Sequence, residues 1–224
     1  MRGSVVQTLI WADWHRHRMH ILLSLVGGAL AFALIQVGGE LPTILGATWF
    51  FISLIVFGSM LPNSNVINER KKQTLAFLMS LPLSATQYTT AKIVSTVGMF
   101  LVSWLTLVIA ALSFIATHPF FPDGMIPAVL ILALFTFVGF CVIAAVALVS
   151  ESEGATIAAT VATNSFYGFG WYLLVRNPVI RADMKSLAPV WSREVLTILG
   201  VEIGLLVLIL GLTFYLQSRK RDFI

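Results

Sequence analysis

Six long apolar segments, separated by short polar stretches, make up most of the chain. Each segment is close to or above the roughly 20 residues that a helix needs to cross the hydrocarbon of a bilayer. The second segment is short, but Leu41–Ile44 can extend it past Pro42. The pattern predicts an all-α integral membrane protein with six transmembrane helices, over residues 21–38, 45–61, 93–116, 125–149, 155–175 and 195–216.

A different apolar spacing marks residues 1–20. Apolar side chains stand at i, i+3, i+4 and i+8, on one side of a helix, at Val6, Leu9, Ile10 and Trp14. Cationic side chains lie beside that stripe, as in helices that rest in the membrane interface. We therefore expect an N-terminal amphipathic helix in the interface plane. The three histidines of this segment share no single face with a carboxylate, so we predict no metal site there.

Residues 62–92 form the long polar interruption of the first half. Leu75, Leu78 and Met79 follow helical spacing, and Pro82 ends that pattern because proline disfavours helix in the residue before it. Ser84 and Gln87 then form a capping box that starts the next helix. The pattern predicts a short amphipathic helix at a membrane face between the second and third spans. It either rests on lipid headgroups or docks a partner protein.

Composition places the chain in the bilayer. The sequence of 224 residues is 58% hydrophobic and 11% charged, whereas soluble domains are about 25% charged. The mean hydropathy is +0.92. A single cysteine excludes a disulfide within the chain. Linkers and repeats are missing from the sequence, so we expect one transmembrane domain over residues 1–224.

The basic residues predict the orientation. Of the 14 Lys and Arg residues, four lie in the segments that six crossings place opposite the N-terminus, namely Arg176, Arg181, Lys185 and Arg193. The rest lie on the side of the N-terminus, including the basic run Arg70, Lys71 and Lys72. The positive-inside rule then places both termini and the loop 62–92 in the cytoplasm. The net charge of +4 reflects these loop residues and does not indicate a nucleic-acid partner.

Glu202 is the carboxylate that lies within an apolar span. An ionisable group at that depth is costly and is a functional-site hypothesis by default. The alternatives are that the side chain is partly hydrated, protonated or paired with a neighbour such as Arg193. A direct role in transport and a purely structural role both stay open from the sequence.

The segment 155–175 carries small and polar residues. Gly154, Ala158 and Ala162 recur four residues apart, a spacing that lets helices approach closely in lipid, either within one subunit or between two. Ser150 and Glu153 form a capping box that predicts the start of this helix. Asn164, Ser165 and Tyr167 either bond to neighbouring helices or face a transported molecule.

The outer segment 176–194 holds Trp191 among four cations and two prolines. We expect an interfacial loop there. Signatures of common enzymes are missing: the sequence has no Gly-x-x-x-x-Gly-Lys loop, no His-Glu-x-x-His and no Gly-x-Ser-x-Gly. No catalytic residue is predicted, and an ATP-driven role would need a separate ATPase.

The loop 62–92 resembles the cytoplasmic loop of ABC-2 type transporter permeases. The resemblance rests on Glu69, Thr74-Leu75, Ser80-Leu81-Pro82, Ser84 and Lys92, and on the layout of the whole chain. Gln73 departs from the pattern, because the family often has Gly before the Thr. The resemblance implies that the loop holds a coupling helix, which docks on an ATP-binding subunit through Glu69, Thr74, Leu75, Phe77, Leu78, Ser80, Leu81, Pro82 and Ser84.

The same resemblance implies the membrane subunit of an ATP-driven exporter in a bacterial cytoplasmic (inner) membrane. Two copies, or one copy with a related permease, would pair with two ABC ATP-binding subunits. ATP and Mg²⁺ would be bound by those partners, so no cofactor is expected on this chain. The family also implies that the first and fifth helices meet at the dimer centre. The candidate dimer or path-lining residues are Gly27, Gly28, Gly154, Ala158, Ala162, Asn164, Tyr167 and Glu202.

Two other classes of function remain open from the sequence. One is a membrane-embedded enzyme that acts on lipids, with Glu202 and outer-loop residues at its site. The other is a scaffold subunit that transports nothing. The missing catalytic clusters count against the enzyme, and ATP-dependent movement of a cargo would exclude the scaffold.

Overall fold

The computed structural model describes residues 2–68 and 85–219, and every regular element in these ranges is helical. Six helices are long: α1 (Arg2–Gln36), α2 (Glu40–Pro62), α5 (Ala85–Thr117), α6 (Met125–Ser150), α7 (Glu153–Arg176) and α9 (Arg193–Arg219). Two elements are short: the π-helical turn η1 (Asn63–Ile67) and α8 (Pro178–Asp183).

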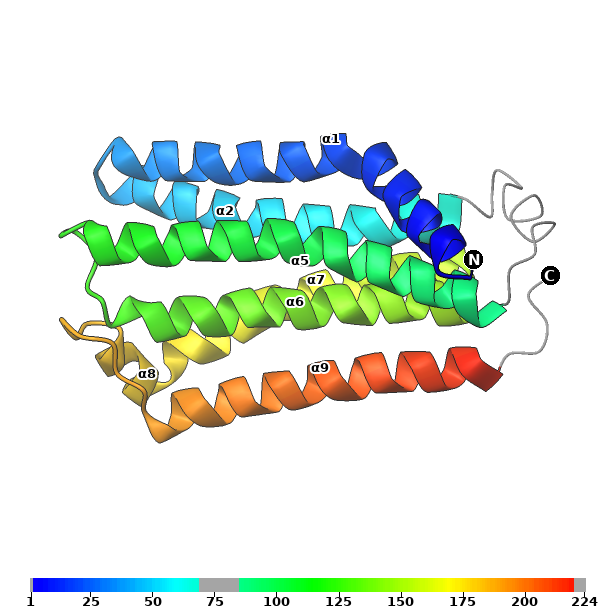
Figure 1. Ribbon diagram of the computed structural model, residues 1–224. Coiled ribbons are helices and arrows are strands. Elements are labelled where there is room, and N and C mark those ends of the chain that lie inside the picture. Colours follow the sequence, from blue (N-terminus) through cyan, green and yellow to red (C-terminus); the bar gives the residue numbers. More distant parts are fainter. Residues whose placement is uncertain (1, 69–84, 220–224) are drawn as a thin grey trace.

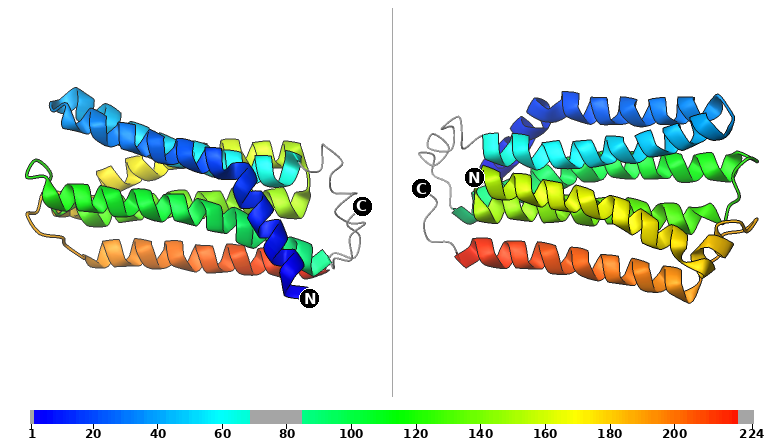
Figure 2. Two further views of the ribbon diagram at one scale, coloured as in Figure 1. Left: turned by 45° about the horizontal axis from the view of Figure 1, so that its top comes forward. Right: turned by 180° about the vertical axis from the view of Figure 1, so that it is seen from behind.

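The long helices run along a common direction in one bundle (Figure 1). α6 lies in the middle and packs against α9, α7, α2 and α5, while α1 packs against α2 and α5. The beginning of α1, η1, the beginning of α5 and the end of α9 lie at one end of the bundle, and α8 lies at the other (Figures 1 and 2). We call these the loop end and the α8 end.

Within residues 2–68 and 85–219, five helices are long and apolar enough to cross a membrane, by length and composition: Val6–Gln36, Glu40–Ile67, Thr90–Thr117, Met125–Ser150 and Arg193–Gln217. They correspond to five of the six predicted spans. The remaining predicted span, 155–175, lies in α7, which has 24 residues and runs beside α6 (Figure 2) but is less apolar because of its threonines, Asn164 and Ser165. The described residues therefore form an all-α membrane protein with five candidate spans.

The N-terminal segment differs from the prediction. We expected a separate interfacial helix over residues 1–20, but α1 is continuous from Arg2 to Gln36. It bends, so that its first turns lean across the beginning of α5 (Figure 2). Asp13 and His17 are buried, with 3% and 2% of their surface exposed, so this face of the helix packs on protein. The segment has no Pro or Gly between residues 4 and 26 that would break the helix.

The two ends of α2 follow from local chemistry. Gly38 and Gly39 have φ angles of +80° and +91°, which a residue with a Cβ rarely adopts, and they turn the chain from α1 into α2. At the other end, Pro62 has no N–H to donate to the preceding turn. The chain continues there as the π-helical turn η1, where the Asn63 side-chain amide donates to the Ser59 carbonyl at 3.0 Å.

The start of α7 corrects one predicted cap. Ser152, and not Ser150, is the N-cap: its hydroxyl accepts the backbone N–H of Ala155 at 3.4 Å. Ser150 is still the last residue of α6 and donates to the Val146 carbonyl at 2.7 Å. Glu151, with φ of 58°, reverses the chain between the two helices. This extra turn shifts the cap by two residues.

Candidate functional site

A buried polar cluster lies at the loop end of the bundle. Lys92 on α5 donates through Nζ to both carboxylate oxygens of Asp13 on α1, at 3.0 Å each. The same Nζ lies 3.2 Å from Oδ1 of Asn65 on η1. The exposed fractions are 2% for Lys92, 3% for Asp13 and 0% for Asn65, so water does not compete for these bonds.

Two hydroxyl groups of α5 complete this cluster. Ser95 donates to Oδ2 of Asp13 at 2.8 Å, and the Asn65 side-chain amide donates to Oγ1 of Thr96 at 2.8 Å. Ser95 and Thr96 are fully buried. We call the five residues Asp13, Asn65, Lys92, Ser95 and Thr96 the clamp. Charged and amide groups at this depth are retained in proteins when they are paired, and every member of the clamp has a partner.

The clamp joins three segments that are far apart in the sequence. Asn65 precedes the segment 69–84 by a few residues, and Lys92 follows it. The side chains on both sides of that segment are thus bonded to each other and, through Asp13, to α1.

The predicted docking residues lie outside the described residues. They are Glu69, Thr74, Leu75, Phe77, Leu78, Ser80, Leu81, Pro82 and Ser84. Lys92, the last member of the resembling motif, is described and belongs to the clamp. The sequence contained one signal for this pairing: Asp13 is a lone acid in a basic segment, and Lys92 enters an apolar span. Their meeting across 79 positions could not be read from spacing.

The two glycines predicted at a dimer contact face neighbours in the same chain. A Cβ added to Gly28 would lie 2.2 Å from Cδ2 of Leu107 on α5, and one added to Gly27 would lie 3.2 Å from Cβ of Ser53 on α2. Both glycines therefore admit close packing of α1 within the bundle.

The candidate residues of α7 divide into two groups. Gly154, Ala158, Ala162 and Asn164 are exposed. Tyr167 instead packs on α6, where its hydroxyl donates to the Thr136 carbonyl at 3.2 Å. Tyr167 therefore bonds to a neighbouring helix, which is one of the two roles predicted for it. The face of α7 that carries the small residues is exposed on the surface of the bundle.

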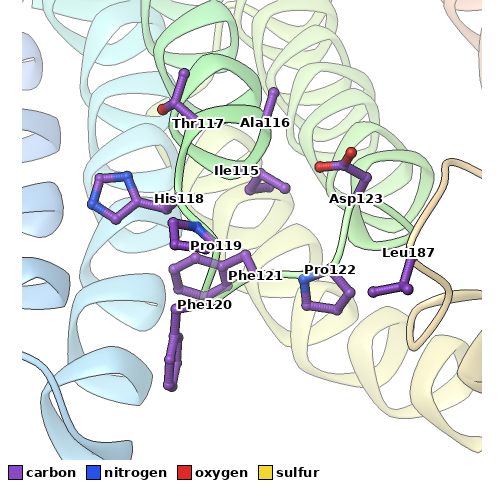
Figure 3. A pocket seen from close by; sticks show the side chains of 10 residues that line it. All are labelled: Ile115, Ala116, Thr117, His118, Pro119, Phe120, Phe121, Pro122, Asp123 and Leu187. Carbon is purple, nitrogen blue, oxygen red and sulfur yellow. The ribbon is translucent and has the colours of Figure 1, made fainter.

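Glu202 is 6% exposed and lines a cavity of about 570 Å³ formed with residues of α6, α7 and α8. A second cavity, of about 550 Å³, lies at the α8 end, between residues 115–123 and Leu187. Figure 3 shows His118 and Asp123 on opposite sides of that second cavity. Among the described residues, no group of three His, Cys, Asp or Glu side chains could hold a metal. The loop residues His118 and Asp123 line a different cavity from Glu202, whereas Asn177 and Ile180 of the outer segment 176–194 line the same cavity as Glu202.

The fold and this distribution of polar groups define a multi-pass helical membrane protein with a buried ion pair where α1, η1 and α5 meet. Residues 18–218 match the family described as ABC-2 family transporter protein. A search of curated proteins and a search of solved structures each found no match.

The chain belongs to the ABC-2 family of transporter proteins. It is a membrane-spanning permease subunit of a transporter and is not itself the catalytic part. Permeases of this family normally work with an ABC ATP-binding subunit. The match contains Asn65 and Lys92 and begins after Asp13, so the acid of the clamp lies outside the matched residues.

Proposed function

We propose that this chain is the permease of an ATP-driven exporter and that residues 69–84 dock on a separate ATPase subunit. Two such ATPase subunits bind ATP and Mg²⁺, and this chain holds no cofactor. The permease works as a dimer, with a second copy or with a related permease. Both termini lie in the cytoplasm of a bacterial cell, and the inner membrane holds the six spans, with α7 as the fifth.

The clamp is the observation that supports this function best. Closure of the ATPase subunits would displace the docked segment, and Asn65 and Lys92 flank that segment. Because Lys92 is bonded to both Asn65 and Asp13, displacement is passed to α1 as well as to α2 and α5. Removing one partner of a buried ion pair costs about 3–5 kcal/mol, so the junction resists separation while the helices tilt.

The exposed face of α7 supports our proposal that this helix lines the translocation path. Its small residues Gly154, Ala158 and Ala162 permit close approach of a second permease, and Asn164 and Ser165 offer exposed polar groups on the same helix. The chain performs no covalent step in this mechanism. It provides the wall of the path and the lever that moves that wall.

Co-purification from the native membrane in mild detergent tests the docking. We expect an ATP-binding cassette protein to accompany the wild-type chain and to be lost from the double variant Leu78→Ser/Leu81→Ser. The matched control is Leu41→Ser/Leu187→Ser, which makes the same changes at exposed positions of the α8 end and should retain the partner. Retention by the Leu78/Leu81 variant, or absence of any ATPase from the wild type, would refute the docking.

A further inference from the structure

The cavity beside Glu202 combines one acidic group with apolar walls. Its volume of about 570 Å³ lies within the range of about 300–1,000 Å³ that is typical of sites for drug-sized ligands. Three phenylalanines, Phe135, Phe166 and Phe169, line it. Glu202 is the one ionisable residue among its lining side chains.

The Glu202 carboxyl group has an unused bonding capacity. Its Oε2 is buried, and no hydrogen-bond donor in the described residues reaches it. The other polar lining residue, Asn177, uses its side-chain oxygen to accept the backbone N–H groups of Val179 and Ile180. Asn177 therefore caps α8 and leaves Glu202 as the acceptor that faces the cavity.

Because Glu202 lies deep in the membrane span, a cationic partner would stabilise its carboxylate strongly. It lies nine residues after Arg193, the first residue of α9, which corresponds to about 13 Å along the helix axis. A carboxylate without a partner at that depth in a bilayer is costly, and an ammonium group offsets that cost through a charge-assisted hydrogen bond. Phenylalanine rings beside the acid add an attraction for a cation.

The mouth of the cavity opens along α7. Phe166, Phe169 and Leu173 line the cavity and are 60%, 54% and 51% exposed, so they stand at its rim. A molecule dissolved in the lipid can enter between these side chains without crossing water. The rim belongs to the same helix for which we propose a path-facing role.

We propose that this cavity binds amphipathic organic cations, with an amine paired to Glu202 and an apolar body against the phenylalanines. The inference rests on the proposed function in that it names the class of molecule that the permease would carry. Anionic lipids are disfavoured because the one ionisable lining group is an acid, and sugars are disfavoured because most of the lining is apolar and offers their hydroxyl groups few partners.

Equilibrium binding to the purified full-length chain in lipid nanodiscs, without nucleotide, tests this assignment. The probe is dansylcadaverine, a primary amine with an apolar fluorophore, and the matched control ligand is its uncharged N-acetyl derivative. We expect the amine to bind at least about tenfold more tightly than the amide to the wild type, as a hydrogen bond between charged groups implies. Glu202→Gln should remove that difference, and Glu194→Gln, at an exposed position of the same helix, should keep it.

A second variant guards against misfolding of Glu202→Gln. Leu173→Trp places a bulkier group at the rim and should weaken both probes, with the protein still folded as judged by its thermal transition. Equal affinity of the wild type for both probes, or unchanged amine binding in either Glu202→Gln or Leu173→Trp, would overturn the proposal. The Leu78/Leu81 variant should still bind the amine, so failure here and failure of ATPase docking are separate results.

Discussion

The ammonium group of Lys92 lies 3.0 Å from both carboxylate oxygens of Asp13, and both side chains are almost completely buried. The two residues come from opposite sides of the segment 69–84 and from different helices. Their contact fixes the N-terminal part of α1 to the beginning of α5. It accounts for the bend of α1 toward α5 at the place where a headgroup-lying helix was expected.

Replacing Lys92 alone should be strongly destabilising. Lys92→Met leaves Asp13 buried without its cation, and we expect a loss of about 3–5 kcal/mol in the free energy of unfolding. The double variant Asp13→Leu/Lys92→Met removes both charges and should recover most of that loss. Thermal unfolding of the purified chain in detergent measures both effects. A single variant as stable as the wild type would show that the pair is not buried in the membrane-embedded protein.

The double variant Asp13→Leu/Lys92→Met should also separate the stability of the protein from the coupling of ATP hydrolysis to transport. The apolar pair fills the space without tying η1 to α1 through Asn65, so the chain folds while transmission weakens. We expect the ATPase partner to bind normally and ATP hydrolysis to continue, with transport lowered at least severalfold. Transport into inverted vesicles, compared with ATP hydrolysis in the same sample, provides the readout. Wild-type transport per ATP would rule out the clamp as the transmitting element.

Gly46 should be intolerant of any side chain. A Cβ at this position of α2 would lie 2.7 Å from the backbone oxygen of Ala31 on α1, and a backbone atom cannot move aside alone. We expect Gly46→Ala to cost about 1–3 kcal/mol through overpacking. Gly200→Ala is the control, because a Cβ there meets no atom within 4 Å. A comparison of the two midpoints of thermal unfolding decides the matter.

Crosslinking in membranes tests the face of α7. Ala158→Cys should yield a disulfide- or bismaleimide-linked dimer if α7 meets its counterpart in a second copy. Val207→Cys, on the exposed surface of α9, should remain monomeric. The native Cys141 is 1% exposed and should give little background. Crosslinking at position 207 but not at 158 would move the dimer contact from α7 to α9.

The membrane class and most of the helices were predictable from the sequence. Apolar runs of sufficient length have few alternatives, since backbone groups in lipid must bond within a helix. The family was predictable as well, through the motif around Ser80-Leu81-Pro82 and the layout of the spans. The docking assignment of that motif stays a prediction, because residues 69–84 lie outside the described part of the chain.

Other features required the tertiary structure. The sequence predicted a cap at Ser150, but the turn at Glu151 shifted it to Ser152. It could not tell which glycines face a second subunit and which face the same chain, because helix rotation decides that. The side chain of Leu107 occupies the space beside Gly28, while the small residues Gly154, Ala158 and Ala162 of α7 are exposed on the surface.

Hydrophobic length is a sum over neighbouring residues, so the sequence by itself determined that this chain is a helical membrane protein, and the resemblance of the loop 62–92 indicated the ABC-2 family. Packing decided the rest. The pairing of Asp13 with Lys92, the role of Asn65 and the burial of Glu202 beside a cavity depend on contacts between helices that are distant in the chain. Such contacts are fixed by the shape and rotation of whole helices, which no local pattern encodes.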